Sequence, residues 1–155
     1  MRLMKMLLIL SLLAGMIYLA GCQGKEEAPS RFPESKLAIF KSSSCGCCGI
    51  FSQYMGREGF DVSVTNNEQM EQLKAEHGVP PELQSCHTTI VGDYFVEGHI
   101  PAEAFDKLLT EKPDIKGIAM PGMPSGSPGM PGSKQGPWII YAVHNDGSTS
   151  EFMRI

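Results

Sequence analysis

The chain has 155 residues, of which 42% are hydrophobic and 19% charged, and its formal net charge is -4. This composition is that of a globular protein rather than a disordered one, and the length suits one ordinary domain. The acidic balance and the lack of a basic run give a nucleic-acid partner no electrostatic support. We therefore expect a small folded protein that does not bind nucleic acid.

The first 21 residues are predicted to be a lipoprotein signal peptide. Arg2 and Lys5 give a positive start, residues 6–20 are uncharged and mostly apolar, and Leu-Ala-Gly precedes Cys22. The run suits a signal-peptide core and is short for a spanning helix, although an uncleaved anchor helix is the alternative. The Leu-Ala-Gly-Cys end resembles the bacterial lipobox, which implies cleavage before Cys22 and acylation of its thiol. We expect a lipid-anchored envelope protein on the periplasmic face, and Gln23 resembles an outer-membrane sorting signal of Gram-negative cells.

The mature chain is predicted to consist of a tether and one domain. Residues 22–36 comprise the acylated cysteine and a polar, proline-containing stretch, which is typical of a flexible tether. The domain is expected over residues 37–155. Its first predicted elements are a strand at 37–40, a loop at 42–49 (SSSCGCCG), a helix at 50–58 and a strand at 60–64.

The second half of the domain begins with a predicted helix that Asn66 or Asn67 caps and that runs to about His77. The next predicted elements are hairpin strands at 88–91 and 94–97, a helix at 101–109, and a C-terminal hairpin of strands 138–143 and 150–155. Between them, residues 117–137 are rich in Gly, Pro, Ser and Met and are predicted to form neither a helix nor a central strand.

The predicted order is strand, CxxC loop, helix, strand, helix, hairpin and helix. This order resembles the thioredoxin-like fold, in which a CxxC motif lies between the first strand and its helix. We therefore expect an α/β protein with a thioredoxin-like β-α-β-α-β-β-α core, to which the C-terminal hairpin is added.

Four cysteines remain once Cys22 is acylated, and three of them fall within Cys45-Gly46-Cys47-Cys48, while Cys86 precedes His87. Structural disulfides are one interpretation, since an exported protein meets an oxidising environment. Cys47 and Cys48 are adjacent, however, and their bridge would be strained. Thiol–disulfide exchange by the Cys45-x-x-Cys48 pair is a second interpretation, because a helix start stabilises a thiolate. Cys47 would interfere with such exchange.

A metal site is the interpretation that the residues favour most. Thiolates are soft ligands that select Cu(I), zinc or iron–sulfur centres. A single zinc ion commonly takes two separate cysteine pairs, whereas three thiolates in four residues suit bridges between several Cu(I) ions. Cys86 and His87 offer a further sulfur and a nitrogen. We therefore place copper ahead of zinc and expect a binding protein rather than an enzyme.

Five segments resemble a family of uncharacterised metal-binding proteins that includes the CopG-type copper-resistance proteins of bacterial envelopes. They are CGCC (45–48), VPPELQSCHT (79–88), GDYFVEGHIPAE (92–103), GIAMPGMPSGSPGM (117–130) and DGSTSEF (146–152). The resemblance implies a thioredoxin-like domain with a multinuclear Cu(I) cluster on Cys45, Cys47, Cys48 and Cys86. It also implies His87 as a ligand and raises the expectation that His99 lies at the site. Other envelope copper-handling proteins are the implied partners.

The remaining donors have alternative roles. His77 lies beside a helix-ending glycine and is expected to interact with that helix end, and His144 next to a turn is expected to be solvated. Met120, Met123 and Met130 can bind Cu(I) as thioethers and form an entry route, but filling gaps in the packing is the favoured interpretation.

Overall fold

The computed structural model describes residue 32 and residues 35–155. The predicted signal peptide, Cys22 and most of the predicted tether lie outside this part, so those predictions stay untested. Among the described residues, no helix combines the length and the apolar character needed to cross a membrane.

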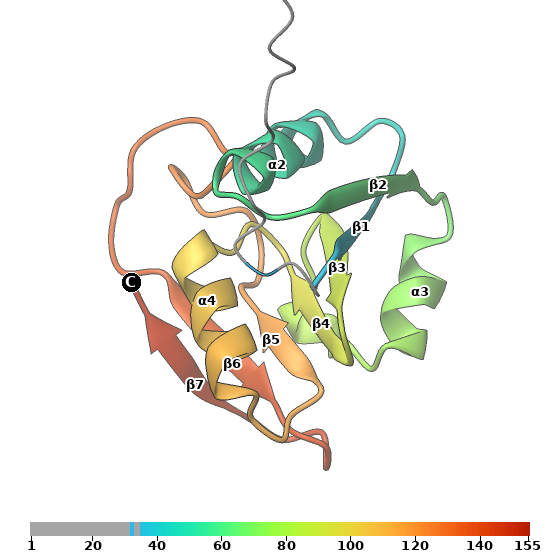
Figure 1. The fold of residues 1–155 in the computed structure, drawn as a ribbon, viewed down its shortest axis with the longest axis vertical. Coiled ribbons are helices and arrows are strands. Elements are labelled where there is room, and N and C mark those ends of the chain that lie inside the picture. Colours follow the sequence, from blue (N-terminus) through green and yellow to red (C-terminus); the bar gives the residue numbers. More distant parts are fainter. Residues whose placement is uncertain (1–31, 33–34) are drawn as a thin grey trace, which may run out of the picture.

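The described strands form one sheet of seven in the order β2-β1-β3-β4-β5-β6-β7 (Figure 1). The strands are β1 (Leu37–Lys41), β2 (Val62–Asn66), β3 (His87–Val91), β4 (Tyr94–Glu97), β5 (Gly117–Ala119), β6 (Ile139–Val143) and β7 (Thr149–Arg154). The β1–β2 and β4–β5 pairs are parallel, and the other neighbours are antiparallel. The protein is therefore a mixed α/β fold.

Helices cover the sheet, and each of its faces packs a separate core. The helices are α2 (Gly46–Arg57), α3 (Met70–Glu76), the short 3-10 helix η1 (Pro81–Leu83) and α4 (Ala102–Glu111). On one face the larger core joins α2 and α4 to the inward residues of five strands, among them Ile39, Val96 and Ile140. A smaller core that includes Leu83 and Phe95 forms on the other face. Alternation along the strands explains this division, since neighbouring side chains point to opposite faces.

The predicted elements from residue 37 to residue 111 occur in the predicted order, and both predicted hairpins are confirmed. The helix near Asn66 and Asn67 begins later than predicted, at Met70. Asn66 ends β2, and the Asn67 side chain accepts the Gln69 N–H in a turn before the helix (2.8 Å).

The prediction that residues 42–49 form a loop was wrong over its second half, because α2 begins at Gly46. Cys48, Phe51 and Met55 are buried at helical spacing and form the inward stripe of α2. Cys48 thus serves as a core residue, and its burial extends the helix through the cysteine motif.

The prediction that residues 117–137 contain no central strand was also wrong. Gly117–Ala119 form β5, which pairs with β4 on one side and β6 on the other. The first proline of the segment is Pro121, so the four residues before it keep their N–H groups, and three of them form the strand. Glycine is required at 117, since a Cβ there would lie 2.2 Å from the Phe95 carbonyl oxygen.

Candidate metal centre

The N-terminus of α2 carries three cysteines within one turn. Cys45 is the N-cap residue, and Cys47 and Cys48 lie in the first turn, where backbone N–H groups have no partner within the helix. Cys45 and Cys48 form a disulfide with their Cα atoms 5.6 Å apart, and the Sγ atoms of Cys45 and Cys47 are 3.6 Å apart. The positive dipole end of the helix favours negative charge there, so it stabilises these cysteines in the thiolate form.

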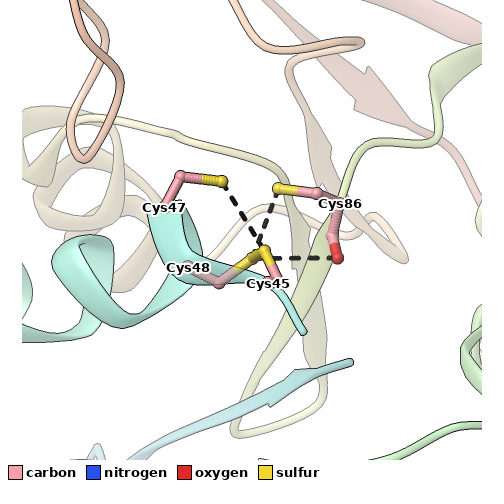
Figure 2. A group of neighbouring side chains, drawn as sticks. All are labelled: Cys45, Cys47, Cys48 and Cys86. Atoms are coloured by element: carbon pink, nitrogen blue, oxygen red, sulfur yellow. Dashed lines mark hydrogen bonds between the residues drawn. A yellow bond between two sulfur atoms is a disulfide. The ribbon is translucent and has the colours of Figure 1, made fainter. Parts of the chain in front are cut away.

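Cys86 brings the fourth sulfur from the segment just before β3. Its Sγ atom lies 3.4 Å from that of Cys48, and it is a free thiol. Figure 2 shows the Cys86 side chain pointing from the segment before β3 toward the cysteines at the start of α2. The ligand atoms of Cys45, Cys47, Cys48 and Cys86 all lie within 4.8 Å of one another. Residues 38 positions apart in the sequence thus complete one sulfur cluster.

His99 approaches Cys86 from the turn after β4. Its Nε2 atom is 2.9 Å from Cys86 Sγ, and its Nδ1 atom is 2.6 Å from the carbonyl oxygen of Pro128. Because a carbonyl oxygen only accepts hydrogen bonds, Nδ1 carries the hydrogen and donates it. Nε2 therefore faces the sulfur cluster with its lone pair, which is the tautomer that a metal ligand needs.

His87 lies fully buried beside the same sulfur. Its Nδ1 atom is 3.4 Å from Cys86 Sγ, and its ring packs against the rings of Phe51 and His99 at centroid distances of 4.4 and 4.8 Å. Its Nε2 atom is buried and has no hydrogen-bond partner among the described residues. A buried polar atom without a hydrogen-bond partner costs free energy, so the His87 ring fits a site in which a bound group supplies that partner.

The protonation of these groups follows from their burial. Burial, and then the nearby Cys47, raises the pKa of the Cys86 thiol to about 12. Burial also lowers the pKa of His99, and it lowers that of His87 well below its usual value with help from His99 and Lys74. At neutral pH the site without metal therefore has a protonated Cys86 thiol and two neutral imidazoles.

The Gly- and Pro-rich segment covers one side of this site. Gly129 has a φ of +83°, and a Cβ there would lie 2.8 Å from the Cys47 carbonyl oxygen, so the segment packs directly on the first turn of α2. Met120 is buried in the larger core, which agrees with a packing role. Met123 is 52% exposed, and Met130 is half-buried.

All six residues predicted at the metal site meet in space. Among the described residues, two groups could hold a metal ion, and they share two members. The groups are Cys45, Cys47, Cys48 and Cys86, and Cys48, Cys86, His87 and His99. His77 and His144 belong to neither group. His77 is the C-cap of α3, at the predicted helix end, whereas His144 Nε2 lies 2.8 Å from Ser150 Oγ and is only half-exposed.

Two contacts at this site were not predicted from the sequence. One is the backbone carbonyl of Pro128 on His99, for which the sequence has no signal because any residue has a carbonyl. The other is the buried ion pair of Lys74 and Glu97 behind Cys86.

Sulfur and imidazole donors converging on a mixed α/β fold define a metal-binding protein. A family model described as "Protein of unknown function, DUF411" matches residues 83–130. Two solved structures are similar to this chain, both titled copper resistance protein CopG. Form 2 is 34% identical with a TM-score of 0.73, and the match covers 78% of this chain and 98% of that chain. Form 1 is 33% identical with a TM-score of 0.73, over 83% of this chain and 98% of that chain.

The chain belongs to the CopG-type copper-resistance family, as its sequence motifs predicted. A comparison with curated proteins finds no match.

Proposed function

We propose that this protein binds several Cu(I) ions on a cluster of cysteine thiolates and so protects cells against copper. The observation that carries the proposal is the convergence of four cysteine sulfurs and two imidazoles in overlapping groups, each within 4.8 Å. Soft thiolates prefer Cu(I), and sulfurs this close can bridge neighbouring ions. The titles of the two similar structures, which name copper resistance, support the same metal.

Copper binding by all four sulfurs requires reduction of the Cys45–Cys48 disulfide. A dithiol reductant supplies the two electrons and two protons that convert that bond into two thiols, and it becomes a disulfide itself. Each cysteine thiol then releases its proton when it becomes a metal-bound thiolate. Cys86, whose thiol is protonated at neutral pH, gives up a proton in the same way. The two imidazoles are neutral already, so they offer nitrogen ligands without a proton to displace.

Several observations support a thioredoxin-like core as the frame of this site. Strands β2, β1, β3 and β4 are adjacent in that order, and β1 and β2 are parallel. Strands β3 and β4 form an antiparallel hairpin, and α2 begins at the CxxC motif. Strands β5–β7 then extend this core at one edge, as Figure 1 shows.

The proposed location is the cell envelope, with lipid on Cys22 holding the protein to a membrane. The support is the order of positive start, apolar run, small residues and cysteine at residues 2–22. In a Gram-negative cell, Gln23 favours the outer membrane. The proposed role is to sequester, buffer or hand on copper, and other envelope copper-handling proteins are the proposed partners.

Thiol–disulfide exchange is the second candidate function, and the Cys45–Cys48 disulfide at a helix start favours it. In that reaction a substrate dithiol would reduce the disulfide and become a disulfide itself, with the two electrons passing to Cys45 and Cys48. The free thiol of Cys86 is 3.4 Å from Cys48 Sγ and would compete for the mixed disulfide.

One experiment separates the two functions. The full-length chain in mild detergent is reduced, made anaerobic and titrated with Cu(I) against a chromophoric chelator. We expect several ions per chain and a loss of bound copper in Cys47→Ser. An oxidoreductase would instead tolerate Cys47→Ser, turn over a test disulfide and fail in Cys45→Ser. Steady turnover without copper binding would overturn the copper proposal.

A further inference from the structure

A buried ion pair lies directly behind the metal site. The side chains of Lys74 on α3 and Glu97 on β4 are 5% and 0% exposed, and they contact each other. Burying two charges costs desolvation energy that their attraction often fails to recover, so such a pair is weak evidence for a stabilising role. The contacts of the pair therefore indicate what it does.

The Glu97 carboxylate binds both sides of the Cys86–His87 pair. Its Oε1 atom accepts the backbone N–H of Ser85 (2.6 Å), and its Oε2 atom accepts the hydroxyl of Thr88 (2.6 Å). Lys74 Nζ donates to the same Thr88 hydroxyl oxygen at 3.1 Å and to Glu97. One carboxylate thus fixes the residue before Cys86 and the residue after His87.

The strand places this network on the face opposite His87. Thr88 and Glu97 are directly paired across β3 and β4, and adjacent residues of a strand point to opposite faces. His87 therefore points to the face of α2, whereas Thr88 and Glu97 point to the face of α3. Lys74 and Glu97 therefore lie on the opposite face of the sheet from the His87 imidazole, and neither residue is a ligand of the proposed metal site.

The turn that follows Glu97 at the end of β4 also positions His99. The N–H of Gly98 donates to the His87 carbonyl oxygen (3.0 Å), so the backbone after Glu97 is bonded to the strand that carries His87. Gly98 has a φ of +88°, and a Cβ there would lie 2.5 Å from the Met120 carbonyl oxygen. The backbone conformation of the turn between Glu97 and His99 is therefore tightly constrained.

We propose that Lys74 and Glu97 are positioning residues that hold the Ser85–Thr88 segment so that Cys86 and His87 face the cysteines of α2. This role rests on the proposed copper function for its purpose. Residues that do not bind the metal commonly orient the metal ligands through hydrogen bonds. Removing such residues lowers metal affinity by about 10- to 100-fold. The acceptor for the Ser85 N–H is the essential part, and Lys74 holds this acceptor in place by donating to Glu97 and to the Thr88 hydroxyl.

Two double variants isolate that acceptor from the charges. Lys74→Leu/Glu97→Gln removes both charges but keeps an amide oxygen for the Ser85 N–H and an amide N–H for Thr88. Lys74→Leu/Glu97→Leu removes the charges and the acceptor together. Neither leaves a buried charge without its partner, so the two differ in the hydrogen bonds to the segment. Leucine replaces both residues because it adds no sulfur that copper could bind.

The first readout is the anaerobic Cu(I) affinity of the reduced full-length variants. We expect the Leu/Leu variant to bind Cu(I) about 10- to 100-fold more weakly than the Leu/Gln variant. The second readout is the rate of alkylation of Cys86 by iodoacetamide, relative to Cys47, in reduced protein without copper. That ratio should rise in the Leu/Leu variant, because a released segment exposes the thiol.

Equal copper affinities and equal alkylation ratios in the two variants, with a difference only in unfolding temperature, would overturn the proposal. Should wild-type protein bind no Cu(I), the copper function fails, and the alkylation ratio still decides whether the pair positions Cys86. If the Leu/Leu variant does not fold, the proposal is tested by amide hydrogen exchange in the wild-type protein. The Ser85 amide must then be protected, and exchange as fast as in the exposed Ser43–Ser44 loop would overturn the proposal.

Discussion

The two halves of the sulfur cluster are built in different ways. The helix half, Cys45, Cys47 and Cys48, comes from a single turn of α2, and only Cys48 is buried. The strand half, Cys86, His87 and His99, comes from two chain segments, and both of its imidazoles are fully buried. The helix half thus supplies donors by local sequence, whereas the strand half has its geometry and protonation set by contacts from distant residues.

Loss of Cys86 is the strongest way to break this comparison, since this residue belongs to both donor groups. We expect Cys86→Ser to weaken Cu(I) binding by more than about 100-fold, which exceeds the usual loss for a residue beyond the ligands. The measurement is chelator competition on the reduced full-length protein. Ser44→Ala, next to the helix half and exposed, is the control and should bind as the wild type does. Equal affinities in the two variants would contradict a shared cluster.

Oxidation tests the helix half alone. With Cys45 and Cys48 bridged, Cys47 and Cys86 are the only thiols left among the described residues, so the oxidised protein should hold fewer Cu(I) ions than the reduced protein. The copper content of both forms, measured after gel filtration without oxygen, checks this. Equal copper content in the two forms would mean that the bridged cysteines are not ligands.

His99 tests how far the strand half depends on its imidazoles. Its Nε2 atom faces Cys86 Sγ, so His99→Ala should lower Cu(I) affinity by about tenfold, as expected for a weaker nitrogen donor beside sulfur ligands. His144→Ala is the matched control, because His144 lies outside both donor groups. An unchanged affinity in His99→Ala would remove this residue from the site.

The pH dependence of copper binding should distinguish the thiol of the strand half from its imidazoles. The pKa of Cys86 is raised to about 12, so between pH 6 and 9 the free thiol is protonated and copper must displace that proton. Affinity therefore rises with pH, and Cys86 contributes about one power of ten per pH unit. The imidazoles, whose pKa values are lowered by burial below their ordinary value, add no such slope at and above neutral pH. Cys86→Ser should reduce the slope of log affinity against pH by about one, and an unchanged slope would contradict this assignment.

A core variant far from the cluster should have the smallest effect on copper. Ile140 on β6 is fully buried in the larger core, and Ile140→Ala should lower the free energy of unfolding by about 2–5 kcal/mol. Copper stoichiometry of the folded variant should be unchanged, because β6 contributes no donor. Denaturant unfolding and copper titration measure the two effects separately, and a change in stoichiometry would show that β6 shapes the site.

The same contrast explains what the sequence could predict. The helix half was found directly, since three cysteines in four residues are visible without a structure. The residues of the strand half were predicted from the Cys86–His87 pair and the family motifs, but their arrangement in space was not. The tautomer of His99 depends on the carbonyl oxygen of Pro128, 29 residues away, and no side chain signals that contact.

The two errors in predicting the fold from the sequence have a similar origin. Residues 42–49 were predicted to form a loop, but the burial of Cys48 with Phe51 extends α2 through the cysteine motif. The strand at Gly117–Ala119 was missed because the composition of the following residues dominated the interpretation. Pairing with both β4 and β6 outweighed that composition, as tertiary contacts often outweigh local preference.

The most direct test of the account is X-ray absorption at the copper edge of the reduced, Cu(I)-loaded full-length protein. If cysteine sulfurs from both halves share several ions, the spectrum must show sulfur neighbours and a copper–copper distance, and Cys86→Ser must weaken both signals. A spectrum with nitrogen and oxygen neighbours alone, identical in wild type and Cys86→Ser, would contradict the account.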